Sequence, residues 1–569
     1  MNVAASASAT DPLAALTAPG TPFEITIEPV RGVPCRVYRR APRHLGDVYA
    51  AARQFATRPF LVYEGQRLAY AEAFERAASL ARELATRHGV GRGTRVAIAM
   101  RNCPEWILSF LAASSLGAVT VLVNSRGSAA EIAHALESTS CELLIADPTR
   151  AQSVRESGLD IPMIVTSDAE GVAPSSFDAL CSAHRGLVLP FVPVDTDDAA
   201  MILFTSGTTG RAKGAVLSHR GAITALWNTQ LSGAILGAQI AAQKGIDLAA
   251  LAAHQPQPCQ LLVYPLFHTS GVHTILLAGL LRGGRIVIMR RWDVGRALEL
   301  IQQERITTVS GAPTMLWDLV NAPGRERYDL SSLVSLAGGG QATPQNLLRA
   351  MASAFPQCLL GGGWGQTETN GVVTMGIGAD YLANPRASGK AAPTSELRIV
   401  NAEGRDQPVG EPGEIWVRSP SNMIGYWNNP EANAAVFESG WLRTGDVGYL
   451  DAEGRIYIVD RKKNMVISGG ENIYCAEVER VLSEHAGVFE AAALGVPDER
   501  LGERLVAVLV PHPNHVLGEE EVRRHVRAQL ADYKVPARVI LESAPFARNA
   551  NGKIDKAELR RRLGHRILE

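Results

Sequence analysis

Hydrophobic and polar positions alternate between a helical and an extended period along most of the chain. Apolar residues recur at helical spacing over 70–87 and 106–115, a pattern typical of helices that bury one face. Short apolar runs predict strands at 94–100, 119–123, 143–146 and 163–165. This β-α-β alternation predicts mostly parallel sheets that are flanked by helices on both faces.

The pattern changes near residue 390, where short strands at 397–400 and 413–418 alternate with Gly- and Pro-containing turns. These strands favour a small barrel or an antiparallel sheet. A basic segment at 461–463 then precedes a compact α+β pattern. Because 569 residues are too many for one hydrophobic core, we expect at least two domains. We place a flexible segment at 1–40, a large α/β domain with the barrel at 41–460, and a smaller mobile α+β domain at 461–569.

The composition is that of an ordinary globular protein, with 46% hydrophobic residues. The 56 basic residues balance 57 acidic ones, which removes any electrostatic case for nucleic acid as a partner. The seven cysteines are scattered and form no C-x-x-C or Cys/His cluster, so we expect neither a disulfide framework nor a structural zinc site.

The uncharged stretch at 106–124 is long enough to raise the question of a membrane span. Serines and a glycine interrupt it and its end is β-branched, so a buried helix that runs into a buried strand is favoured. The first 20 residues lack a basic region and a continuous apolar run, so we expect no secretory signal. We therefore expect a cytoplasmic protein without a transmembrane segment.

A loop rich in glycine and hydroxyl residues follows an apolar run at 199–204. Three glycines, four hydroxyl residues and two cations fall within the ten positions 205–214. Glycine lets the backbone approach a ligand, and hydroxyl and N–H groups donate to anionic oxygens, so the loop is predicted to bind phosphate. A Walker A loop does not fit, because Ala212 stands at the sixth position from Gly207 and Gly214 follows Lys213. The alternative is a surface loop that merely contains Ser, Thr and Gly.

Two further motifs suggest a nucleotide site. In 361–369, a glycine run leads to Trp364, whose face could stack on a purine, and to Glu368, whose carboxylate could hold Mg²⁺. In 441–448, Asp446 lies in a tight turn and could accept hydrogen bonds from a ribose diol. The alternatives are a glycine-rich turn with Trp364 in the core, and a simple Asx-turn at Asp446.

Single residues elsewhere carry weaker signals. Lys553 follows a glycine near the C-terminus, although a lysine on such a turn is usually only solvated. His268 follows an apolar run, and a lone histidine is more often a satisfied core residue than a functional one. His268 and His273 are separated by four residues, which is not a metalloprotease pattern, so we do not predict a zinc site there.

In this order, and over about residues 45–560, these motifs resemble the adenylate-forming superfamily. That superfamily comprises acyl- and aryl-CoA synthetases, firefly-luciferase-like enzymes and nonribosomal adenylation domains. The resemblance rests on the segments 205–214, 364–368, 441–448, 454–479 and 552–553.

The resemblance implies a nucleotide-binding role for many of these residues. The phosphate loop would hold the β- and γ-phosphates of ATP through Thr205, Ser206, Gly207, Thr208, Thr209, Gly210 and Lys213. Further nucleotide contacts would come from Gly340, Trp364, Gly365, Gln366, Thr367, Asp446, Ile458 and Arg461. Trp364 would lie against adenine, Thr367 at the α-phosphate and Asp446 on the ribose. Thr205 and Glu368 would bind Mg²⁺.

The resemblance also implies which residues are catalytic, which bind the thiol and which bind the acyl group. Lys553 would serve the adenylation step together with Glu368, and His268 would lie where the acyl and thiol tunnels meet. Lys463 would be the hinge of the small domain, and Ser468, Gly469 and Gly470 would line the channel for the pantetheine arm of coenzyme A. The acyl pocket would be formed by His268, Ser310, Gly311, Met315, Gly338, Gly339, Gly361 and Gly362.

The function implied is that of an acyl-CoA synthetase, an acid–thiol ligase that uses ATP, Mg²⁺ and coenzyme A. The acid should be apolar, whether fatty, alicyclic or aryl, because the pocket segments are rich in Gly, Ala, Val and Met and have no Asp for an ammonium group. Transfer of the acyl group to a carrier protein, and a non-catalytic nucleotide-binding homologue, are the alternatives. The sequence leaves open whether the chain forms a homodimer.

Three features depart from the pattern of the superfamily. Trp364 replaces the usual smaller aromatic residue, and Asn549 stands where a hydroxyl residue is common. The segment 232–259 is longer than usual and rich in Ala and Gln, so it could form an unusual acyl tunnel, a lid or an oligomer contact.

Overall fold

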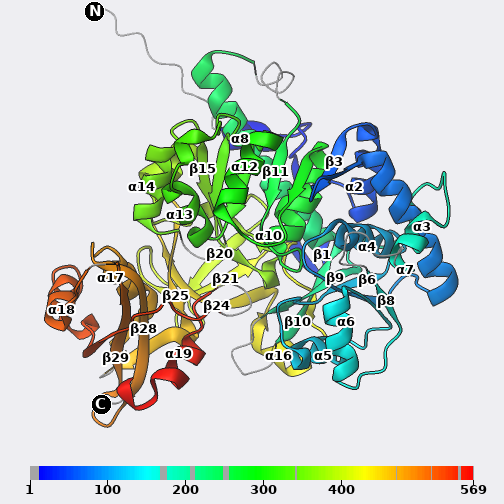
Figure 1. The fold of residues 1–569 in the computed structure, drawn as a ribbon. Helices are drawn as coiled ribbons and strands as arrows, with labels where there is room; N and C mark the ends of the chain where they lie inside the picture. Colours follow the sequence, from blue (N-terminus) through cyan, green and yellow to red (C-terminus); the bar gives the residue numbers. More distant parts are fainter. Residues whose placement is uncertain are drawn as a thin grey trace, which may run out of the picture.

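The computed structural model describes residues 12–166, 176–205, 212–247, 256–339, 343–468, 471–513, 515–548 and 553–567. Two large sheets with flanking helices form most of the molecule, and a smaller antiparallel sheet and a separate C-terminal unit complete it (Figure 1). The predicted α/β class, with a small barrel-like sheet and a smaller α+β unit at the C-terminus, is confirmed.

The first sheet has seven strands in the order β22-β10-β9-β6-β5-β7-β8. It has five parallel strands: β5 (Arg95–Ala99), β6 (Val119–Leu122), β7 (Leu143–Ala146), β8 (Met163–Val165) and β9 (Ala199–Thr205). The first four are those that the apolar runs at 94–100, 119–123, 143–146 and 163–165 predict. Two antiparallel strands extend it, β10 (Lys213–Ser218) and β22 (Gly425–Tyr426). Its connecting helices are α3 (Tyr70–His88), α4 (Pro104–Ser115), α5 (Ala129–Ser138), α6 (Pro148–Glu156) and α7 (Ser176–Ser182).

The helix α4 and the strand β6 form the uncharged stretch that raised the question of a membrane span. Nearly every residue of α4 is buried, because its all-round apolar surface packs against α3 and the first sheet. None of the helices in the described part of the chain is long and apolar enough to cross a membrane.

The second sheet has nine strands in the order β19-β18-β15-β14-β13-β11-β12-β3-β4. Its strands are β3 (Pro59–Tyr63), β4 (Gln66–Ala69), β11 (Cys259–Leu262), β12 (Arg285–Ile288), β13 (Thr308–Gly311), β14 (Ser335–Gly338), β15 (Leu359–Gly362), β18 (Thr374–Ile377) and β19 (Lys390–Ala391). One face is covered by α12 (Val294–Glu304), α13 (Pro313–Asn321) and α14 (Gln345–Ala354) through a continuous apolar cluster. The opposite face is covered by α2 (Leu45–Ala52), α8 (His219–Lys244) and the segment 269–282, which comprises α10 (Thr269–Gly271), a π-helical turn at Val272–Leu277 and α11 (Ala278–Arg282).

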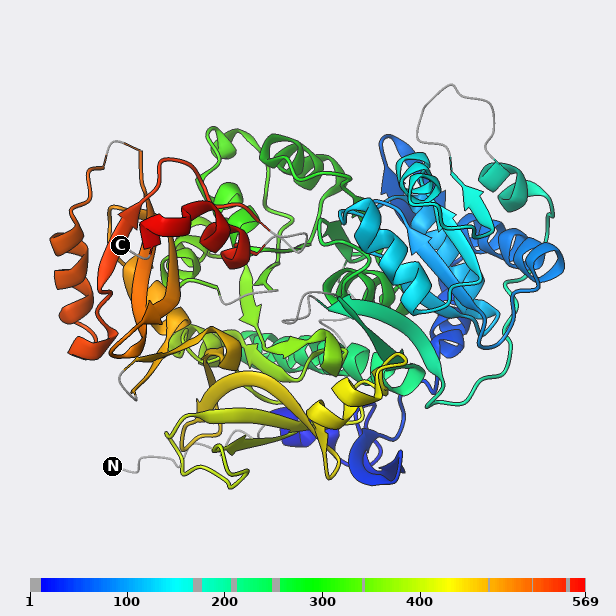
Figure 2. The same ribbon diagram turned by 90° about the horizontal axis from the view of Figure 1, so that it is seen from below.

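The barrel-like sheet is antiparallel and lies beneath the two large sheets (Figure 2). It consists of β20 (Glu396–Val400), β21 (Gly413–Arg418), β23 (Phe437–Glu438), β24 (Trp441–Leu450) and β25 (Ile456–Arg461). The helix α16 (Pro430–Val436) precedes β23, and a small ladder of β16 (Gly365–Gln366) with β17 (Gly371–Val372) precedes the sheet in the chain.

The C-terminal unit has its own sheet and its own apolar clusters. Its strands are β26 (Met465–Ser468), β27 (Glu471–Tyr474), β28 (Val488–Asp498), β29 (Gly502–Pro511) and β30 (Arg538–Leu541), and its helices are α17 (Cys475–Ser483), α18 (Glu519–Arg527) and α19 (Lys556–Leu563). Figures 1 and 2 both show these elements, coloured orange to red, beside the rest of the molecule. A short helical turn at Lys462–Asn464 joins β25 to β26, so the predicted hinge residue Lys463 lies in the connection between the two sheets.

The predicted flexible segment at 1–40 is structured over its described part, 12–40. The helix α1 (Pro12–Thr17) and the hairpin of β1 (Ile25–Val30) with β2 (Val33–Tyr38) pack against α8. Tyr38 donates a hydrogen bond of 2.7 Å to Asn228 Oδ1 on α8. The sequence does not reveal this packing, because it depends on a few apolar residues that meet a helix 190 positions away.

Candidate active site

A cavity of about 1800 Å³ lies at the carboxyl ends of β9, β11, β13, β14 and β15. Ligands in α/β folds bind at this edge of the sheet. The volume exceeds the roughly 300–1,000 Å³ of a pocket for one small ligand, so two substrates could be bound together. Fifteen predicted site residues line it: Thr205, Lys213, His268, Ser310, Met315, Gly338, Gly339, Gly361, Gly362, Gly365, Gln366, Thr367, Glu368, Arg461 and Lys553.

Several predicted residues lie outside the described residues or outside the cavity lining. Ser206, Gly207, Thr208, Thr209, Gly210, Gly340, Gly469 and Gly470 fall outside the part of the chain that the structure describes. Gly311, Trp364, Asp446, Ile458 and Ser468 do not belong to the described lining of the cavity. Gly311 lies in register with Gly338 on β14, and a Cβ at this position would contact Met315.

The two described ends of the phosphate loop meet across a strand pair. Thr205 ends β9 and lies directly opposite Lys213, the first residue of the antiparallel β10. The hydroxyl and the ammonium group are thus placed together at the cavity, and the loop between them is held at both ends by the sheet. This arrangement suits the binding of an anion at the loop.

Glu368 is held by a residue that the sequence did not point to. Tyr426 on β22 donates a 2.8 Å hydrogen bond to Glu368 Oε1, and its ring lies 5.2 Å from Lys213 Nζ. Burial raises the pKa of Tyr426, and the Glu368 carboxylate raises it further, so this hydroxyl stays a donor. Only the pairing of β10 with β22 brings Tyr426 here, 58 residues along the chain from Glu368.

The side chain of Trp364 packs inside the barrel-like sheet. Its ring is 9% exposed and packs with Val373, Ile399, Ile415, Val417 and Ile456, with Ile458 at the edge of this cluster. Its indole N–H donates a 2.9 Å hydrogen bond to Asp446 Oδ2. The large ring packs in the apolar interior of the barrel-like sheet, and its N–H helps to orient the Asp446 carboxylate.

Asp446 is only 4% exposed, and it is oriented from two sides. Besides the indole of Trp364, Arg461 Nε contacts its Oδ1 at 3.0 Å from the neighbouring strand β25. A carboxylate offers about four lone-pair sites, so it retains capacity for two hydroxyl donors. The arrangement fixes the carboxylate at the edge of the cavity, where Arg461 itself belongs to the lining.

The strands β13–β15 form the wall of the cavity where the acyl pocket is predicted, and their side chains alternate between the cavity and the apolar cluster on the other face. One set of alternate residues, Val309, Leu336 and Leu360, enters the apolar cluster under α12–α14. The other set faces the cavity and is small or polar except for Leu359: Thr308, Ser310, Ser335, Ala337, Leu359 and Gly361. Successive residues point to opposite faces, so this sheet is apolar on one face and leaves room on the other.

The helix α8 forms the opposite wall. Residues at helical spacing on it, Gln230, Gly233, Ala234 and Gly237, line the cavity. A Cβ at Gly233 would meet nothing within 4 Å. The stretch 232–244 of the unusual 232–259 segment is therefore a continuation of α8 and forms part of the tunnel wall, whereas 248–255 lies outside the described residues.

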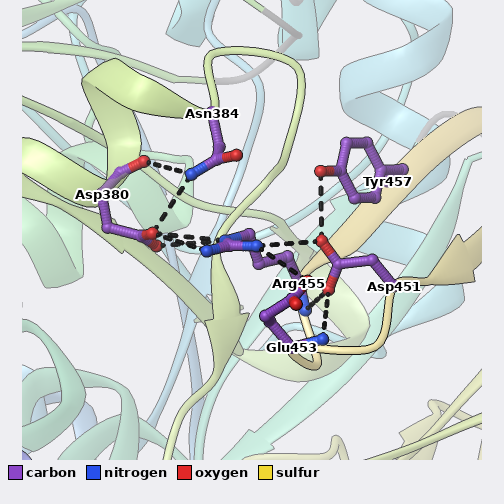
Figure 3. A network of polar contacts seen from close by, with 6 residues as sticks. All are labelled: Asp380, Asn384, Asp451, Glu453, Arg455 and Tyr457. Atoms are coloured by element: carbon purple, nitrogen blue, oxygen red, sulfur yellow. Dashed lines mark hydrogen bonds and ion pairs between the residues drawn. The ribbon is translucent and has the colours of Figure 1, made fainter.

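Tyr381 on α15 (Gly378–Ala383) fits against the glycines of β15 and β18. A Cβ at Gly362 would lie 2.7 Å from the Tyr381 hydroxyl, and one at Gly376 would lie 2.7 Å from its ring. Arg455 anchors this helix by bridging Asp380 on α15, at 3.0 Å, to Asp451 in the β24–β25 turn, at 3.2 Å (Figure 3). The glycines thus serve the packing of Tyr381 as well as the shape of the pocket.

The two histidines have different surroundings. His268 lines the cavity, and its ring is tilted by 57° against that of Phe267 at a centroid distance of 4.5 Å. His273 is buried and its Nδ1 donates to the carbonyl of Asn370 at 2.9 Å, which supports the turn that follows Glu368. Burial lowers the pKa of His273 to about 4, so the ring is neutral. The described residues contain no group of three or more His, Cys, Asp or Glu side chains that could hold a metal ion.

The C-terminal unit contributes Lys553 to the cavity from the turn that precedes α19. Ser468 instead lies at the end of β26, where it pairs with Glu471 and Gly502. In this arrangement the cavity therefore receives the lysine, and Ser468 belongs to a strand ladder elsewhere in the C-terminal unit.

Comparisons with known proteins agree with these observations. Residues 48–427 match the model of the AMP-binding enzyme family, and residues 477–553 match that of the AMP-binding enzyme C-terminal domain. A feruloyl-CoA synthase of Amycolatopsis sp is 36% identical over 88% of this chain and 95% of its own length. A CoA ligase of Rhodococcus jostii for a methyl-dioxo-octahydroindenyl propanoyl group is 34% identical over 90% of this chain and 96% of its own.

Solved structures of o-succinylbenzoate CoA synthetase from Bacillus subtilis are also similar. Its complex with an acyl-adenylate intermediate has a TM-score of 0.75 and 29% identity, and it covers 90% of this chain and 97% of the other. Its complex with ATP and a magnesium ion has a TM-score of 0.73 and 28% identity, over 90% and 98% of the two chains. From the fold, the site and these matches, the chain belongs to the AMP-binding enzyme family.

Proposed function

We propose that this protein is an AMP-forming acid–CoA ligase. It forms an acyl-adenylate from a carboxylic acid and ATP with release of pyrophosphate, and then transfers the acyl group to coenzyme A. The observation that carries the proposal is the single cavity in which Lys553, Glu368 and the ends of the phosphate loop meet a tunnel of small residues. The relatives named above as CoA ligases, and the solved synthetase with its bound acyl-adenylate, support it.

In the first step, the acid's carboxylate attacks the α-phosphate of ATP and pyrophosphate leaves. A carboxylate is a poor acyl donor because its leaving group would be oxide, whereas AMP leaves readily. Displacement at phosphorus requires mainly positioning and neutralisation of charge. Lys213 and Lys553 supply positive charge to the phosphates, Thr367 contacts the α-phosphate, and Asp446 holds the ribose.

The oxygen donors at the cavity fit a magnesium ion. Glu368 and Thr205 supply a carboxylate and a hydroxyl, which are the hard ligands that Mg²⁺ prefers together with phosphate oxygens and water. Tyr426 occupies one lone pair of Glu368 Oε1 and orients the carboxylate. A bound Mg²⁺ would neutralise charge on the ATP phosphates.

In the second step, the thiol of coenzyme A attacks the acyl carbonyl and AMP leaves. Lys553 is needed near the phosphate in the first step and would obstruct the second. Rotation of the C-terminal unit about Lys463 would withdraw Lys553 and bring Ser468, Gly469 and Gly470 to the cavity. The position of Lys463 in the connection between β25 and β26 supports this hinge.

The tunnel favours an acid with a ring-shaped apolar skeleton that carries oxygen substituents. Small residues of β13–β15 and α8 leave room beside larger apolar residues such as Met315 and Leu359, and Thr308, Ser310 and Ser335 add hydroxyl groups. Within the described residues, Gln230 Nε2 and Gln260 Oε1 are buried and have no hydrogen-bond partner. A buried polar atom without a partner costs about 1–3 kcal/mol, so substituents that pair with these amides would be selected. Aryl and alicyclic acids satisfy this requirement better than plain fatty acids.

Pyrophosphate release across fatty, alicyclic and aryl acids, with and without coenzyme A, tests the function. Release with one class of acid, with steady turnover only when coenzyme A is present, is the expected result. Release that stops after one turnover despite coenzyme A would point to a carrier-protein acceptor. Absence of release with every acid would contradict the ligase.

A further inference from the structure

The segment that carries Lys553 is flanked by two ion pairs within the C-terminal unit, one to the strand β28 and one to the helix α17. Before it, Arg548 pairs with Glu490 on β28 and forms an isolated β-bridge with Ile554. After it, Lys556 begins α19 and its Nζ lies 2.6 Å from Glu479 Oε1 on α17. Lys556 is only three residues from Lys553.

Glu479 is a rigid anchor for this contact. The same oxygen, Oε1, accepts a 2.7 Å hydrogen bond from the backbone N–H of Ala493 on β28. Burial raises the pKa of Glu479, and the nearby Lys556 opposes this rise. A half-buried carboxylate with a backbone donor and an ammonium partner has little freedom to move.

The helix that carries Glu479 is itself tied to the nucleotide side of the cavity. Asp460 Oδ2, on β25, accepts a 2.8 Å hydrogen bond from the N–H of Ala476 in the first turn of α17. Asp460 precedes Arg461, which contacts Asp446. Successive contacts therefore connect the Lys553 turn, through Lys556, α17 and β25, to the residues proposed to hold the ribose.

We propose that Lys556 is a positioning residue for adenylation: its contact with Glu479 fixes the start of α19 and thereby aims Lys553 into the cavity. This inference rests on the proposed function, because it assumes that Lys553 serves the first half-reaction. In the second half-reaction the turn is withdrawn, so the contact of Lys556 should not matter there.

The chain offers a matched control on the same helix. Lys534 Nζ lies 2.6 Å from Glu477 Oε2, and Glu477 is on α17 two residues before Glu479. The exposed fractions of the two pairs are similar, 17% and 25% for Lys534 and Glu477 against 21% and 23% for Lys556 and Glu479. Lys534 is in a different short helix, at Asp532–Lys534, and is not attached to the Lys553 turn.

The experiment compares the full-length variants Lys556→Met, Lys556→Arg, Lys534→Met and Lys553→Ala with the wild type. Pyrophosphate release reports adenylation, and thioester formation from supplied acyl-AMP reports the second half-reaction. For Lys556→Met we expect adenylation to fall by about 10–100-fold, since a displacement of about 1 Å can cost 10²-fold. We expect thioester formation within about 3-fold of the wild type, recovery of most adenylation in Lys556→Arg, and both activities retained in Lys534→Met.

Adenylation that persists in Lys556→Met while Lys553→Ala abolishes it would overturn the inference, and so would an equal loss of both half-reactions. Unchanged adenylation in Lys553→Ala would instead overturn the role proposed for Lys553. If Lys556→Met does not fold, Glu479→Gln replaces it, because the amide keeps the shape and removes the charge. The same split between half-reactions is expected for that variant, and its absence would count against the inference.

Discussion

The large part of the molecule and the C-terminal unit contribute to the site in different ways. The large part supplies the cavity walls from the carboxyl ends of strands in two sheets, whose apolar clusters are extensive and continuous. The C-terminal unit has separate clusters and contributes Lys553 through one turn. Side chains fixed by buried sheets cannot move far, whereas a lysine on a separately packed unit can leave without disturbing either core. In the proposed mechanism, the large part would select the substrate and the C-terminal unit would exchange the two half-reactions.

The largest expected effect separates the two half-reactions. Lys553→Ala should lower adenylation by about 10²–10³-fold, because a positive charge that stabilises the transition state is lost. Thioester formation from supplied acyl-AMP should stay within a few-fold of the wild type. Pyrophosphate and thioester assays measure the two steps separately. Equal losses in both steps would contradict the proposed alternation.

Acidic pH should lower the free energy of unfolding of the large part of the molecule, which contains two buried histidines. Burial lowers the pKa of His219 and His273 from 6.5 to about 4. In the unfolded chain these rings bind protons as the pH falls below 6.5, whereas in the folded chain they stay neutral until about pH 4. The stability that depends on the neutral rings is therefore fully present above pH 6.5. It is lost as the pH falls towards 4, by roughly 3 kcal/mol for each ring.

All eight tryptophans lie at or before Trp441, so their fluorescence reports the unfolding of the large part. The denaturant midpoint from fluorescence should therefore fall between pH 6.5 and pH 4. His273→Gln should flatten this dependence, whereas His88→Gln, at the exposed end of α3, should leave it unchanged. A midpoint that does not depend on pH in this range would refute the prediction.

A side chain that fills the tunnel should change the choice of acid and leave the chemistry intact. Gly233→Trp places an indole where a Cβ meets open space. The kcat/KM for ring-shaped acids should fall by about 10–100-fold through exclusion from the pocket, while propionate should be used as before. Pyrophosphate release with both acids is the measurement, and an equal loss for propionate would show that the variant affects more than the tunnel.

The smallest expected effect concerns the polar substituents of the acid. Gln260→Leu removes a buried acceptor that has no partner among the described residues. The ratio of kcat/KM for a hydroxylated cinnamic acid over cinnamic acid should fall by about 5-fold or more. An unchanged ratio would show that Gln260 does not contact the substrate.

The fold could be predicted in its repeating parts and less well where distant segments meet. The apolar runs at 94–100, 119–123, 143–146 and 163–165 became the parallel strands β5–β8, because burial on both faces leaves a clear signal in the sequence. The described part of the 1–40 segment was not recognised as structured, since its few apolar residues have a partner only in α8. The roles of Lys463 and of the residues at 468–470 stay predictions.

The residues of the candidate site could also be predicted where they lie in local motifs, but not where they depend on contacts between distant segments. Local motifs predict Glu368, Thr367, Lys213 and Lys553 as site residues, and all four line the cavity, while their roles stay predictions. Tyr426 was missed, because its contact with Glu368 depends on the pairing of β10 with β22. Trp364 was found as part of a motif, but only the packing of the barrel-like sheet directs its indole to Asp446.

The sequence by itself determined the class of chemistry and the family, because phosphate-binding and carboxylate-bearing turns are local and keep their residues adjacent. Only the tertiary structure decided the shape of the tunnel, the orientation of Asp446 and the attachment of the Lys553 turn. The shape of the tunnel depends on which faces of β13–β15 and α8 meet. The orientation of Asp446 depends on its ion pair with Arg461, and the attachment of the Lys553 turn depends on the ion pair between Lys556 and Glu479. A linear pattern specifies which side chains are buried, but their partners are set by strand register and helix packing.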